Sequence, residues 1–384
     1  MAVLPQERSG LGQAAVLALG LSLATAPAAA QQNIEQSEQQ DFRAVTLARG
    51  LDHPWGMAFL PDGGILITER RGDLRLFKGG ELQKAPIAGT PEVEARGQGG
   101  LLDVALHPDF AENRLVYLSY AGAGPGGAGT EVARARFDGT RLEDLEVIFQ
   151  AEPKTSGGAH YGSRLAFDRE GLLYITLGDR RSYMEEAQKP SSHLGSILRV
   201  HDDGEIPADN PFVGVEGTKA EIFSYGHRNV QGLALRPADG RLWAHEHGPR
   251  GGDEVNLLKA GANYGWPAIT YVIDYSGAII SDKTEAEGME QPVVYWVPSI
   301  APSGMTFYDG DLFPQWRGDL FVGALAGRHL RRLEMEGDQV VGQEELLGGL
   351  RERIRDVRSG PDGHLYILTD AGNGRLIRLE PAAP

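Results

Sequence analysis

Several short segments of the chain place ionisable or amide side chains among glycines, a composition typical of loops that surround a binding site. In one of them, residues 159–164, the candidate is His160, because the pKa of histidine is ordinarily near neutrality. A loop histidine that faces a central opening can act as a general base. A buried histidine bonded to backbone groups is the alternative, and the residue type leaves both open.

Arginines dominate two further segments. In the first, Arg228 precedes Asn229, and its guanidinium offers a rigid fork suited to carboxylates or quinone oxygens. In the second, the alternation of a strand places Arg353 and Arg355 on the same face, where two like charges favour a bound anion. The alternatives are an Arg228 paired with a carboxylate, and two solvated arginines at a strand edge.

Residues 245–254, with the nearby 263–267, are rich in glycine and carboxylates. His245 and His247 stand two residues apart, a spacing that could suit zinc. Exposed backbone carbonyls beside a carboxylate suit a hard cation such as calcium better. The spacing differs from the calcium loop of an EF-hand.

Residues 97–103, Gly-Gln-Gly-Gly-Leu-Leu-Asp, would let a ligand approach the backbone closely. The segment lacks the lysine and the following helix of a phosphate-binding loop. The chain also has no dinucleotide-binding fingerprint. The sequence therefore argues against nicotinamide chemistry.

A short sequence motif, repeated six times, indicates the elements that position these segments. Each copy is a tight turn, commonly with Asp-Gly, followed by a short strand of β-branched and aromatic residues. Six such copies predict an all-β chain folded as a six-bladed β-propeller. Loops from every blade then surround one opening, so polar residues just after these strands become functional candidates. The copies begin at Pro61, His107, Asp168, Pro237, Trp316 and Pro361.

One propeller domain, residues 43–384, is predicted after two leading segments. Residues 1–30 are typical of a secretory signal peptide, in which Arg8 precedes an apolar run and cleavage follows Ala30. An uncleaved anchor is the alternative. Residues 31–42 are polar and are predicted to be a mobile lead-in. A periplasmic or secreted protein without a membrane span is expected.

Two stretches, residues 180–222 and 267–300, interrupt the repeat and are predicted to be long connections. Long loops inside a domain are usually functional, although ordinary decoration of the blades is the alternative. Pairing of a terminal strand with the blade at the other end of the chain would close the ring and remove sheet edges.

The composition excludes several classes of function. The formal net charge of −16 argues against binding to nucleic acid or to anionic membranes. The chain has no cysteine, which excludes disulfides, thiolate catalysis, iron–sulfur clusters and cysteine-ligated zinc. The sequence leaves open whether the protein is a monomer or a homodimer.

The motifs, taken together and in order, resemble the soluble pyrroloquinoline quinone (PQQ)-dependent glucose and aldose sugar dehydrogenases, and most closely the periplasmic aldose sugar dehydrogenases. The resemblance covers about residues 45–380. It rests on segments that begin at His53 (HPWGMAFLPDG), Gly97 (GQGGLLDVALHPDF), Gly226 (GHRNVQGL), His247 (HGPRGGDEVN), Asn263 (NYGWP), Pro302 (PSGMTFY) and Arg353 (RIRDV).

The resemblance implies a function and roles for particular residues. His160 would take the proton from the anomeric hydroxyl of an aldose while hydride passes to PQQ, and Asp179 would orient His160. Arg228 would stabilise the quinone oxygen that becomes negative. The residues implied to hold PQQ are Gln98, Arg228, Asn229, Tyr275, Leu325, Ala326, Gly327, Arg353 and Arg355. The residues implied to hold calcium are Gly248, Pro249, Glu254 and Tyr264, the glycine, the proline and the tyrosine through their carbonyls.

One departure concerns residues 323–330, where some relatives carry a lysine against the quinone and this chain has none. Backbone groups of 325–327 could contact the cofactor instead, and Arg328 could substitute for the lysine. Two other functions stay open: a calcium-dependent propeller lactonase or esterase, and a non-catalytic propeller that binds a protein or a sugar. The preferred sugar and the electron acceptor are unknown from the sequence.

Overall fold

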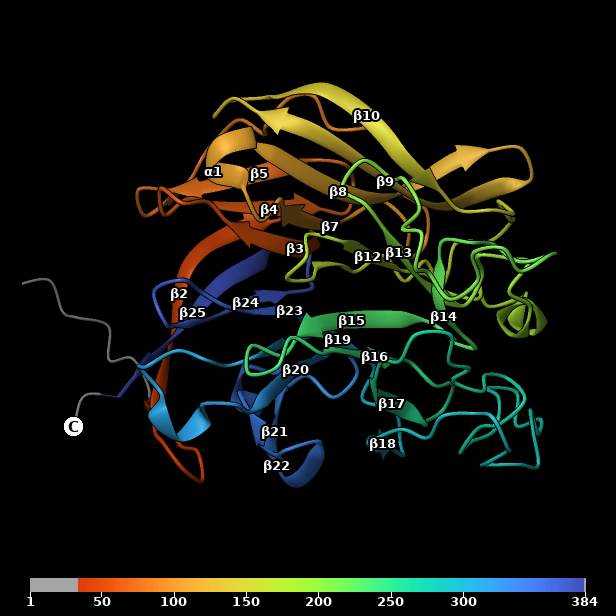
Figure 1. Cartoon of the computed structure of the whole chain (residues 1–384). Coiled ribbons are helices and arrows are strands. Elements are labelled where there is room, and N and C mark those ends of the chain that lie inside the picture. The colour runs from red at the N-terminus through yellow and green to blue at the C-terminus, as the bar shows by residue number, and fades with distance from the viewer. Residues whose placement is uncertain (1–33, 383–384) are drawn as a thin grey trace, which may run out of the picture. The chain divides into compact units, whose positions relative to one another are not determined.

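Six antiparallel sheets are arranged around a common axis in the computed structural model, which describes residues 34–382 (Figure 1). This is the predicted six-bladed β-propeller. The predicted signal peptide and its cleavage after Ala30 lie outside the described residues. Within 34–382, no helix is long and apolar enough to cross a membrane.

The strands follow one another blade by blade, from the innermost strand outward. The first three blades are β3 (Pro54–Phe59), β4 (Ile65–Glu69), β5 (Leu74–Lys78) and β6 (Glu81–Leu82); β7 (Leu101–Leu106), β8 (Leu115–Gly124), β9 (Gly127–Phe137) and β10 (Leu142–Gln150); and β11 (Leu165–Phe167), β12 (Leu173–Thr176), β13 (Ser196–Val200) and β14 (Ile222–Tyr225). The short helices α1 (Phe110–Asn113) and η1 (Met184–Gln188) lie in connections of the second and third blades.

The other three blades repeat the pattern. They are β15 (Val230–Leu235), β16 (Leu242–Glu246), β17 (Asp253–Leu257) and β18 (Val294–Trp296); β19 (Pro302–Phe307), β20 (Leu320–Ala324), β21 (Leu330–Glu336) and β22 (Gln339–Leu346); and β23 (Ile354–Ser359), β24 (Leu365–Thr369), β25 (Gly374–Pro381), β2 (Phe42–Leu51) and β1 (Ile34–Glu35). The 3-10 helices η2 (Pro314–Trp316) and η3 (Gly348–Leu350) lie in connections of this half.

All six copies of the repeated sequence motif form the turn between the first and second strands of a blade, and the apolar part of each copy is the second strand. In the first copy, the Leu60 N–H donates to the Gly64 carbonyl and Gly63 has a φ of +82°, which favours glycine. The strands that follow are buried because aromatic and branched side chains pack between neighbouring blades. Trp243 of the fourth blade, for example, contacts Phe307 of the fifth at 5.8 Å between ring centroids.

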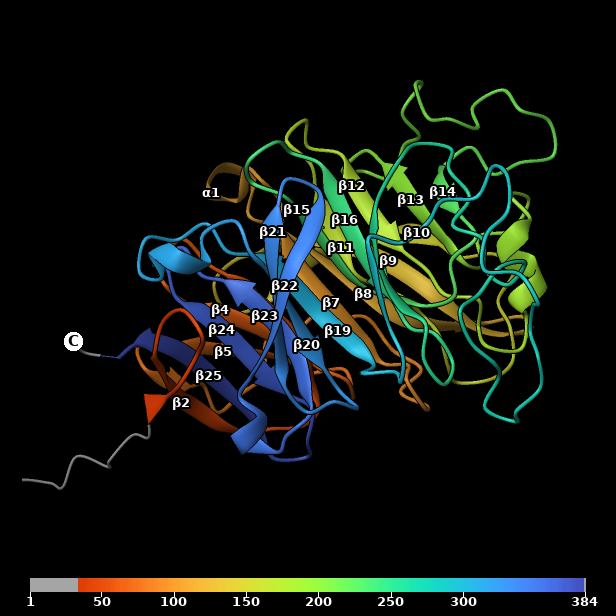
Figure 2. The same ribbon diagram turned by 90° about the horizontal axis from the view of Figure 1, so that it is seen from below.

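The prediction of one long connection over residues 180–222 is wrong in part, because β13 runs through it. Ile197, Leu198 and Val200 are buried between the blades, whereas the prolines on either side of β13 had suggested an uninterrupted loop. The prediction for 267–300 is closer, since only β18 forms there. Figure 2 shows these connections of the third and fourth blades at one end of the ring, away from α1.

The N-terminal strand β2 closes the ring by pairing with the C-terminal strand β25, as expected for a propeller. Residues Ile34–Glu35 of the predicted lead-in form β1, which pairs with the start of β2. The Glu38 N–H also donates to the carboxylate of Glu344. The described part of the lead-in therefore has defined partners on the sixth and fifth blades.

Closure of the ring predicts a large effect for Phe42→Ala. Phe42 lies at the start of β2, is fully buried and packs edge-on against Trp316 at 5.5 Å. Its truncation should lower the free energy of unfolding by about 3–5 kcal/mol, because a buried aromatic ring is replaced by a cavity. Urea unfolding would measure this change. Ile34→Ala is the matched control, since Ile34 is 57% exposed and its loss should change the same quantity by about 0.5 kcal/mol or less.

A buried ionic layer crosses the propeller axis. The Arg164 guanidinium lies 3.3 Å from the Asp103 carboxylate and 3.1 Å from that of Asp356. Arg358 contacts the same two carboxylates at 2.9 and 3.1 Å. Each arginine is paired with both carboxylates, so the charges of the layer compensate one another. The layer separates the two ends of the propeller axis.

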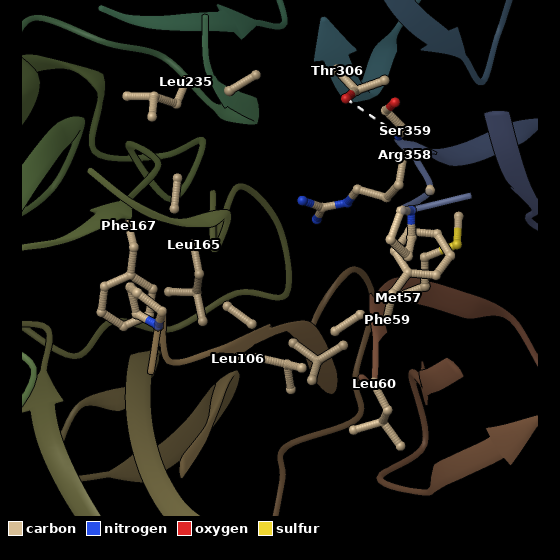
Figure 3. A pocket seen from close by; sticks show the side chains of 18 of the residues that line it. Met57, Phe59, Leu60, Leu106, Leu165, Phe167, Leu235, Thr306, Arg358 and Ser359 are labelled. Atoms are coloured by element: carbon tan, nitrogen blue, oxygen red, sulfur yellow. Dashed lines mark hydrogen bonds between the residues drawn. The ribbon is translucent and has the colours of Figure 1, made fainter. Parts of the chain in front are cut away.

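Beyond this layer lies a cavity of about 760 Å³, lined by the carboxyl ends of the innermost strands. Figure 3 shows its apolar wall, with Phe59, Leu106 and Phe167 around the opening and Arg358 pointing inward. Because both cations and carboxylates of the ionic layer are already paired, this end offers little polar chemistry. The candidate active site is at the other end.

Candidate active site

The site lies where the loops before the innermost strands meet the residues that follow the second strands. Both sets reach the same end of the ring because neighbouring strands in a blade are antiparallel. A cavity of about 250 Å³ lies between them. Its lining combines cations, amides and aromatic rings: Trp55, Arg70, Gln98, Leu102, Tyr161, Gly162, Asn229, Gln231, His247, Tyr275, Ala301, Leu325, Arg353, Arg355 and Asp370.

His160 lies beside this cavity, between its lining residues Gln98 and Tyr161, and is paired with Asp179. The His160 Nδ1 is 2.6 Å from Oδ1 of Asp179, and both side chains are buried. An ionised carboxylate only accepts hydrogen bonds, so Nδ1 carries the proton and Nε2 is left with a lone pair. The pair has the geometry of a base held in one tautomer by its carboxylate partner.

Several backbone contacts fix the loop that carries His160. Its N–H donates to Oε1 of Gln98 at 2.7 Å. The guanidinium of Arg180 donates to the Gly157 carbonyl at 2.9 Å and also to that of Ala159. Gly178, in the segment that follows β12, permits the close approach of the two loops, because a Cβ there would lie 2.4 Å from the His160 carbonyl oxygen. The imidazole is therefore held by its backbone as well as by Asp179.

Burial lowers the pKa of His160 below its ordinary value. The Asp179 hydrogen bond acts in the opposite direction, and the positive charge of Arg228 adds to the lowering. His160 is consequently neutral at pH 7, the state that a general base requires.

Backbone strain is concentrated around this pair. His160 and Ser163 have φ of +53° and +83°, and Arg180 and Arg181 have φ of +56° and +64°. Left-handed conformations are costly for residues with a Cβ and tend to persist where function requires them. The two segments that hold the pair are thus kept in shape by the surrounding structure.

Arg353 and Arg355 form a cationic wall on the sixth blade. Both contact Oδ2 of Asp370, at 3.1 and 3.3 Å, and His53 Nδ1 lies 2.9 Å from Oδ1 of the same carboxylate. Two arginines share one carboxylate, so the wall keeps a net positive charge. Burial lowers the pKa of Arg355 to about 10, against the opposing effect of Asp370.

Asp370 stays ionised in this wall. Burial would raise its pKa, but the charges of Arg355 and Arg353 and the hydrogen bond from His53 hold the pKa well below its ordinary value. The Nε of Arg355 is buried and has no hydrogen-bond partner among residues 34–382. A hydrogen-bond donor without a partner, next to a net positive charge, favours the binding of an anion.

Arg228 lies between the cavity and the fourth blade. Its guanidinium donates to the carbonyls of His247 and Gly248, both at 2.9 Å, and lies 5.3 Å from the ring centre of Trp266 and 5.9 Å from that of Tyr275. Its side-chain bonds are thus to carbonyls, not to the carboxylate that the alternative reading required. An arginine with neutral partners keeps its full charge for a ligand.

A second, very small cavity of about 10 Å³ adjoins Arg228, close to the space that one water or ion needs. It is lined by oxygen-bearing residues that include Glu246, Gly248, Glu254 and Tyr264. Burial raises the pKa of Glu254 well above its ordinary value, and the charge of Glu246 adds to the rise. Two carboxylates in such surroundings suit a divalent cation.

Carboxylates alone would not complete a metal site here. No group of three or more His, Cys, Asp or Glu side chains suited to a metal occurs in the described part of the chain. Backbone carbonyls would have to contribute, and the Gly248 carbonyl also accepts a hydrogen bond from Arg228. Asp253 fixes this turn by accepting the Gly248 N–H at 2.9 Å.

The structure brings most of the candidate residues together, but not all. The cavity is lined by Gln98, Asn229, Tyr275, Leu325, Arg353 and Arg355. Ala326 and Gly327 are exposed and outside the lining, and their N–H groups donate to the Ile300 carbonyl, so their contact with the cofactor stays a prediction. Pro249 is likewise outside the lining of the small cavity.

Sequence reasoning missed Trp55, Arg70, Gln231, Asp370 and Trp266 as site residues. Asp370 and Arg70 immediately follow β24 and β4, the position that the repeat marks as functional, so this signal was present. Trp55 and Gln231 lie within innermost strands, where a buried side chain is more commonly part of the core.

Comparison with known proteins gives consistent matches over nearly the whole domain. A family model described as Glucose / Sorbosone dehydrogenase matches residues 51–378. The chain is 49% identical over 337 residues to aldose sugar dehydrogenase YliI of Escherichia coli, covering 86% of this chain and 91% of that protein.

Two solved structures show how closely the fold agrees. The apo-form of the soluble aldose sugar dehydrogenase from Escherichia coli superposes with a TM-score of 0.86, at 46% identity over 89% of this chain and 100% of that one. The PQQ-bound form of aldose sugar dehydrogenase from Streptomyces coelicolor superposes with a TM-score of 0.73, at 31% identity over 88% of this chain and 98% of that one.

Proposed function

Because the chain belongs to the glucose/sorbosone dehydrogenase family, a family of oxidoreductases, we propose that it oxidises the anomeric carbon of aldose sugars to lactones with PQQ as the cofactor. The observation that carries the proposal is the buried His160–Asp179 pair beside a cavity walled by Arg353 and Arg355. A neutral base and an excess of positive charge are what sugar oxidation with an anionic cofactor needs.

The residues of the cavity fit PQQ, a flat molecule with several carboxylates. Arg353 and Arg355 would face its carboxylates, and the unpartnered Nε of Arg355 offers a further donor. Gln98 and Asn229 would bind its polar edges through their amides. When bound, PQQ supplies the two-electron acceptor that no protein side chain provides.

The protein's own part in the reaction is to hold the sugar and to move one proton. The Nε2 of His160 accepts the proton of the anomeric hydroxyl, and the carboxylate of Asp179 stabilises the imidazolium that forms. Burial of the pair excludes water that would compete for the proton. Arg228 presents positive charge on the same side of the cavity, where it stabilises negative charge that develops on an oxygen.

Calcium is proposed at the small cavity, where Glu254, Glu246 and the Gly248 and Tyr264 backbone supply oxygen donors. Pro249 is proposed as a further carbonyl donor on the resemblance alone. As a Lewis acid beside the cavity, the cation would add to the positive charge of Arg228. The Gly248 carbonyl, which accepts a hydrogen bond from Arg228, has a second lone pair with which it would bind the cation.

The calcium site predicts a stability change that is independent of catalysis. Millimolar calcium should raise the melting temperature of the wild-type protein by about 5 °C, because a ligand that binds only the folded state stabilises it. Glu254→Gln should abolish this rise, and differential scanning calorimetry would measure both. Glu345→Gln, which changes a carboxylate paired with Arg331 on the fifth blade, should keep the rise. An undiminished rise in Glu254→Gln would remove Glu254 from the site.

The location and the electron acceptor are also proposals. Removal of residues 1–30 would leave a periplasmic or secreted protein that passes electrons from the cofactor to an external acceptor. The two other functions lack support from the cavity, since a central metal built from several carboxylates would be expected in a propeller lactonase. A propeller that only binds a ligand would not need a buried base on a strained backbone.

Reduction of an artificial dye by the purified protein tests the proposal. Glucose and a panel of other aldoses are supplied with and without added PQQ and calcium. Dye reduction that depends on both PQQ and sugar supports the function. A visible absorbance shift of PQQ without turnover of any aldose would point to a different alcohol substrate. No shift at all would overturn the cofactor assignment and favour the lactonase or the binding module.

A further inference from the structure

Trp266 occupies a position between the two groups that carry the proposed chemistry. Its indole Nε1–H donates to Oδ2 of Asp179 at 2.8 Å, and the bond is buried. The other carboxylate oxygen, Oδ1, receives His160 Nδ1 and the N–H of Arg181 at 2.7 Å. The Arg228 guanidinium lies 5.3 Å from the centre of the indole ring.

Main-chain hydrogen bonds hold Trp266 in the connection between β17 and β18. The Trp266 N–H donates to the Gly226 carbonyl at 2.9 Å, and its carbonyl accepts the Gln188 side chain at 2.8 Å. The residue is 8% exposed. Asp179 belongs to the third blade, so this hydrogen bond links the fourth blade to the carboxylate that holds His160. The Asp179 N–H also donates directly to the Arg228 carbonyl at 2.8 Å.

The Trp266 Nε1–H holds Oδ2 of Asp179, whereas His160 and Arg181 hold Oδ1. Without the bond from Trp266, the carboxylate could turn about the Cβ–Cγ bond and shift Oδ1 relative to His160. A bonded carboxylate also has less charge to offer the imidazole than one with a free oxygen. Both effects act on His160 through Asp179, since the indole N–H donates to the carboxylate and not to the imidazole.

We propose that Trp266 is a positioning residue that fixes the carboxylate of Asp179, and through it the imidazole of His160, while its ring supports the guanidinium of Arg228. The proposal deepens the proposed function and rests on it for the catalytic consequence. The charged groups that face His160 are Asp179, Arg228 and Arg181, and the nearby His247 is kept neutral by burial. None of these side chains changes in the test below.

The test is Trp266→Phe, which keeps an aromatic ring and removes the N–H donor. The first readout is the pKa of His160 in the protein without PQQ. NMR titration of the imidazole signals measures this pKa. The signals of His160 are identified by their loss in His160→Gln. The expected result is an upward shift, because the unbonded Asp179 carboxylate attracts the imidazolium more strongly. The second is steady-state kinetics with PQQ, where kcat should fall about 10-fold with the KM for sugar unchanged.

Trp243→Phe is the matched control. Trp243 is fully buried in the fourth blade, and its indole N–H has no hydrogen-bond partner among the described residues. The change should leave the His160 pKa and kcat unaltered. An unchanged or lower His160 pKa in folded Trp266→Phe would overturn the proposal, whatever the activity. If the wild-type protein turned over no aldose but the His160 pKa still rose in Trp266→Phe, only the proposed function would be overturned. The positioning role of Trp266 would stand.

Discussion

Replacing His160 by glutamine should lower kcat by about 10²–10⁴-fold, the usual contribution of a general base, while PQQ binding is retained. Glutamine keeps an amide donor for the Asp179 carboxylate but cannot take up the substrate proton. The His160 side chain is beside the cavity, not part of the cationic wall, so the affinity for PQQ should change little. Single-turnover kinetics and a PQQ titration measure the two quantities separately.

The pH dependence sharpens this prediction. A base must be unprotonated, and burial lowers the pKa of His160 below 6.5. Wild-type kcat/KM should therefore fall only as pH drops through this lowered pKa and should be flat near pH 7. His160→Gln should lose that acid limb. His364→Gln is the control, since His364 forms a similar pair with Asp362 at 3.0 Å at the opposite end of the ring. Equal turnover in wild type and His160→Gln would remove His160 from the mechanism.

Replacing Arg355 by methionine should weaken PQQ binding by about 30- to 5,000-fold. Loss of a buried charged hydrogen-bonding partner costs about 2–5 kcal/mol in comparable complexes. The remaining Arg353 and His53 are still bonded to Asp370, so the wall would change from net positive to near neutral. The dissociation constant, measured by titrating the PQQ-free protein, reports the effect directly.

Arg331→Met controls for the loss of a partly buried arginine. Arg331 pairs with Glu345 at 2.7 Å on the fifth blade, away from the cavity lining. Its replacement should leave the dissociation constant within about twofold, as is usual for ion pairs at the surface. If Arg355→Met bound PQQ as tightly as Arg331→Met, the cationic wall would not be the cofactor site.

The fold could be predicted almost completely from the sequence because its signal is local and repeated. Each turn, such as Pro61–Gly64, uses residues that tolerate positive φ, and each following strand is short and apolar. β13 was missed for a physical reason. Its apolar alternation covers only Ser196–Val200, and long proline- and glycine-rich segments surround it. β13 is specified mainly by its pairing with β12 and β14, so its own sequence shows only a weak strand pattern.

The site could be predicted in part. The resemblance and the repeat located His160, Arg353 and Arg355, and the structure places Asp179 against His160 as expected. The bond from Trp266 to Asp179 joins residues 87 positions apart on different blades, and no local pattern encodes such a contact. Ala326 and Gly327 lie outside the cavity lining and their N–H groups donate to the Ile300 carbonyl, so their contact with the cofactor stays a prediction.

The pairing of β2 with β25 has a consequence for how the protein is made. Phe42 pairs with Pro381, so the ring cannot be completed until nearly the entire domain has been synthesised. Contacts this far apart in sequence carry a high cost in loop-closure entropy and slow the final step of folding. A chain that ends before β25 would leave the long strand β2 with an open edge, ready to pair with another molecule. Incomplete chains should therefore aggregate or be degraded rather than persist as five-bladed fragments.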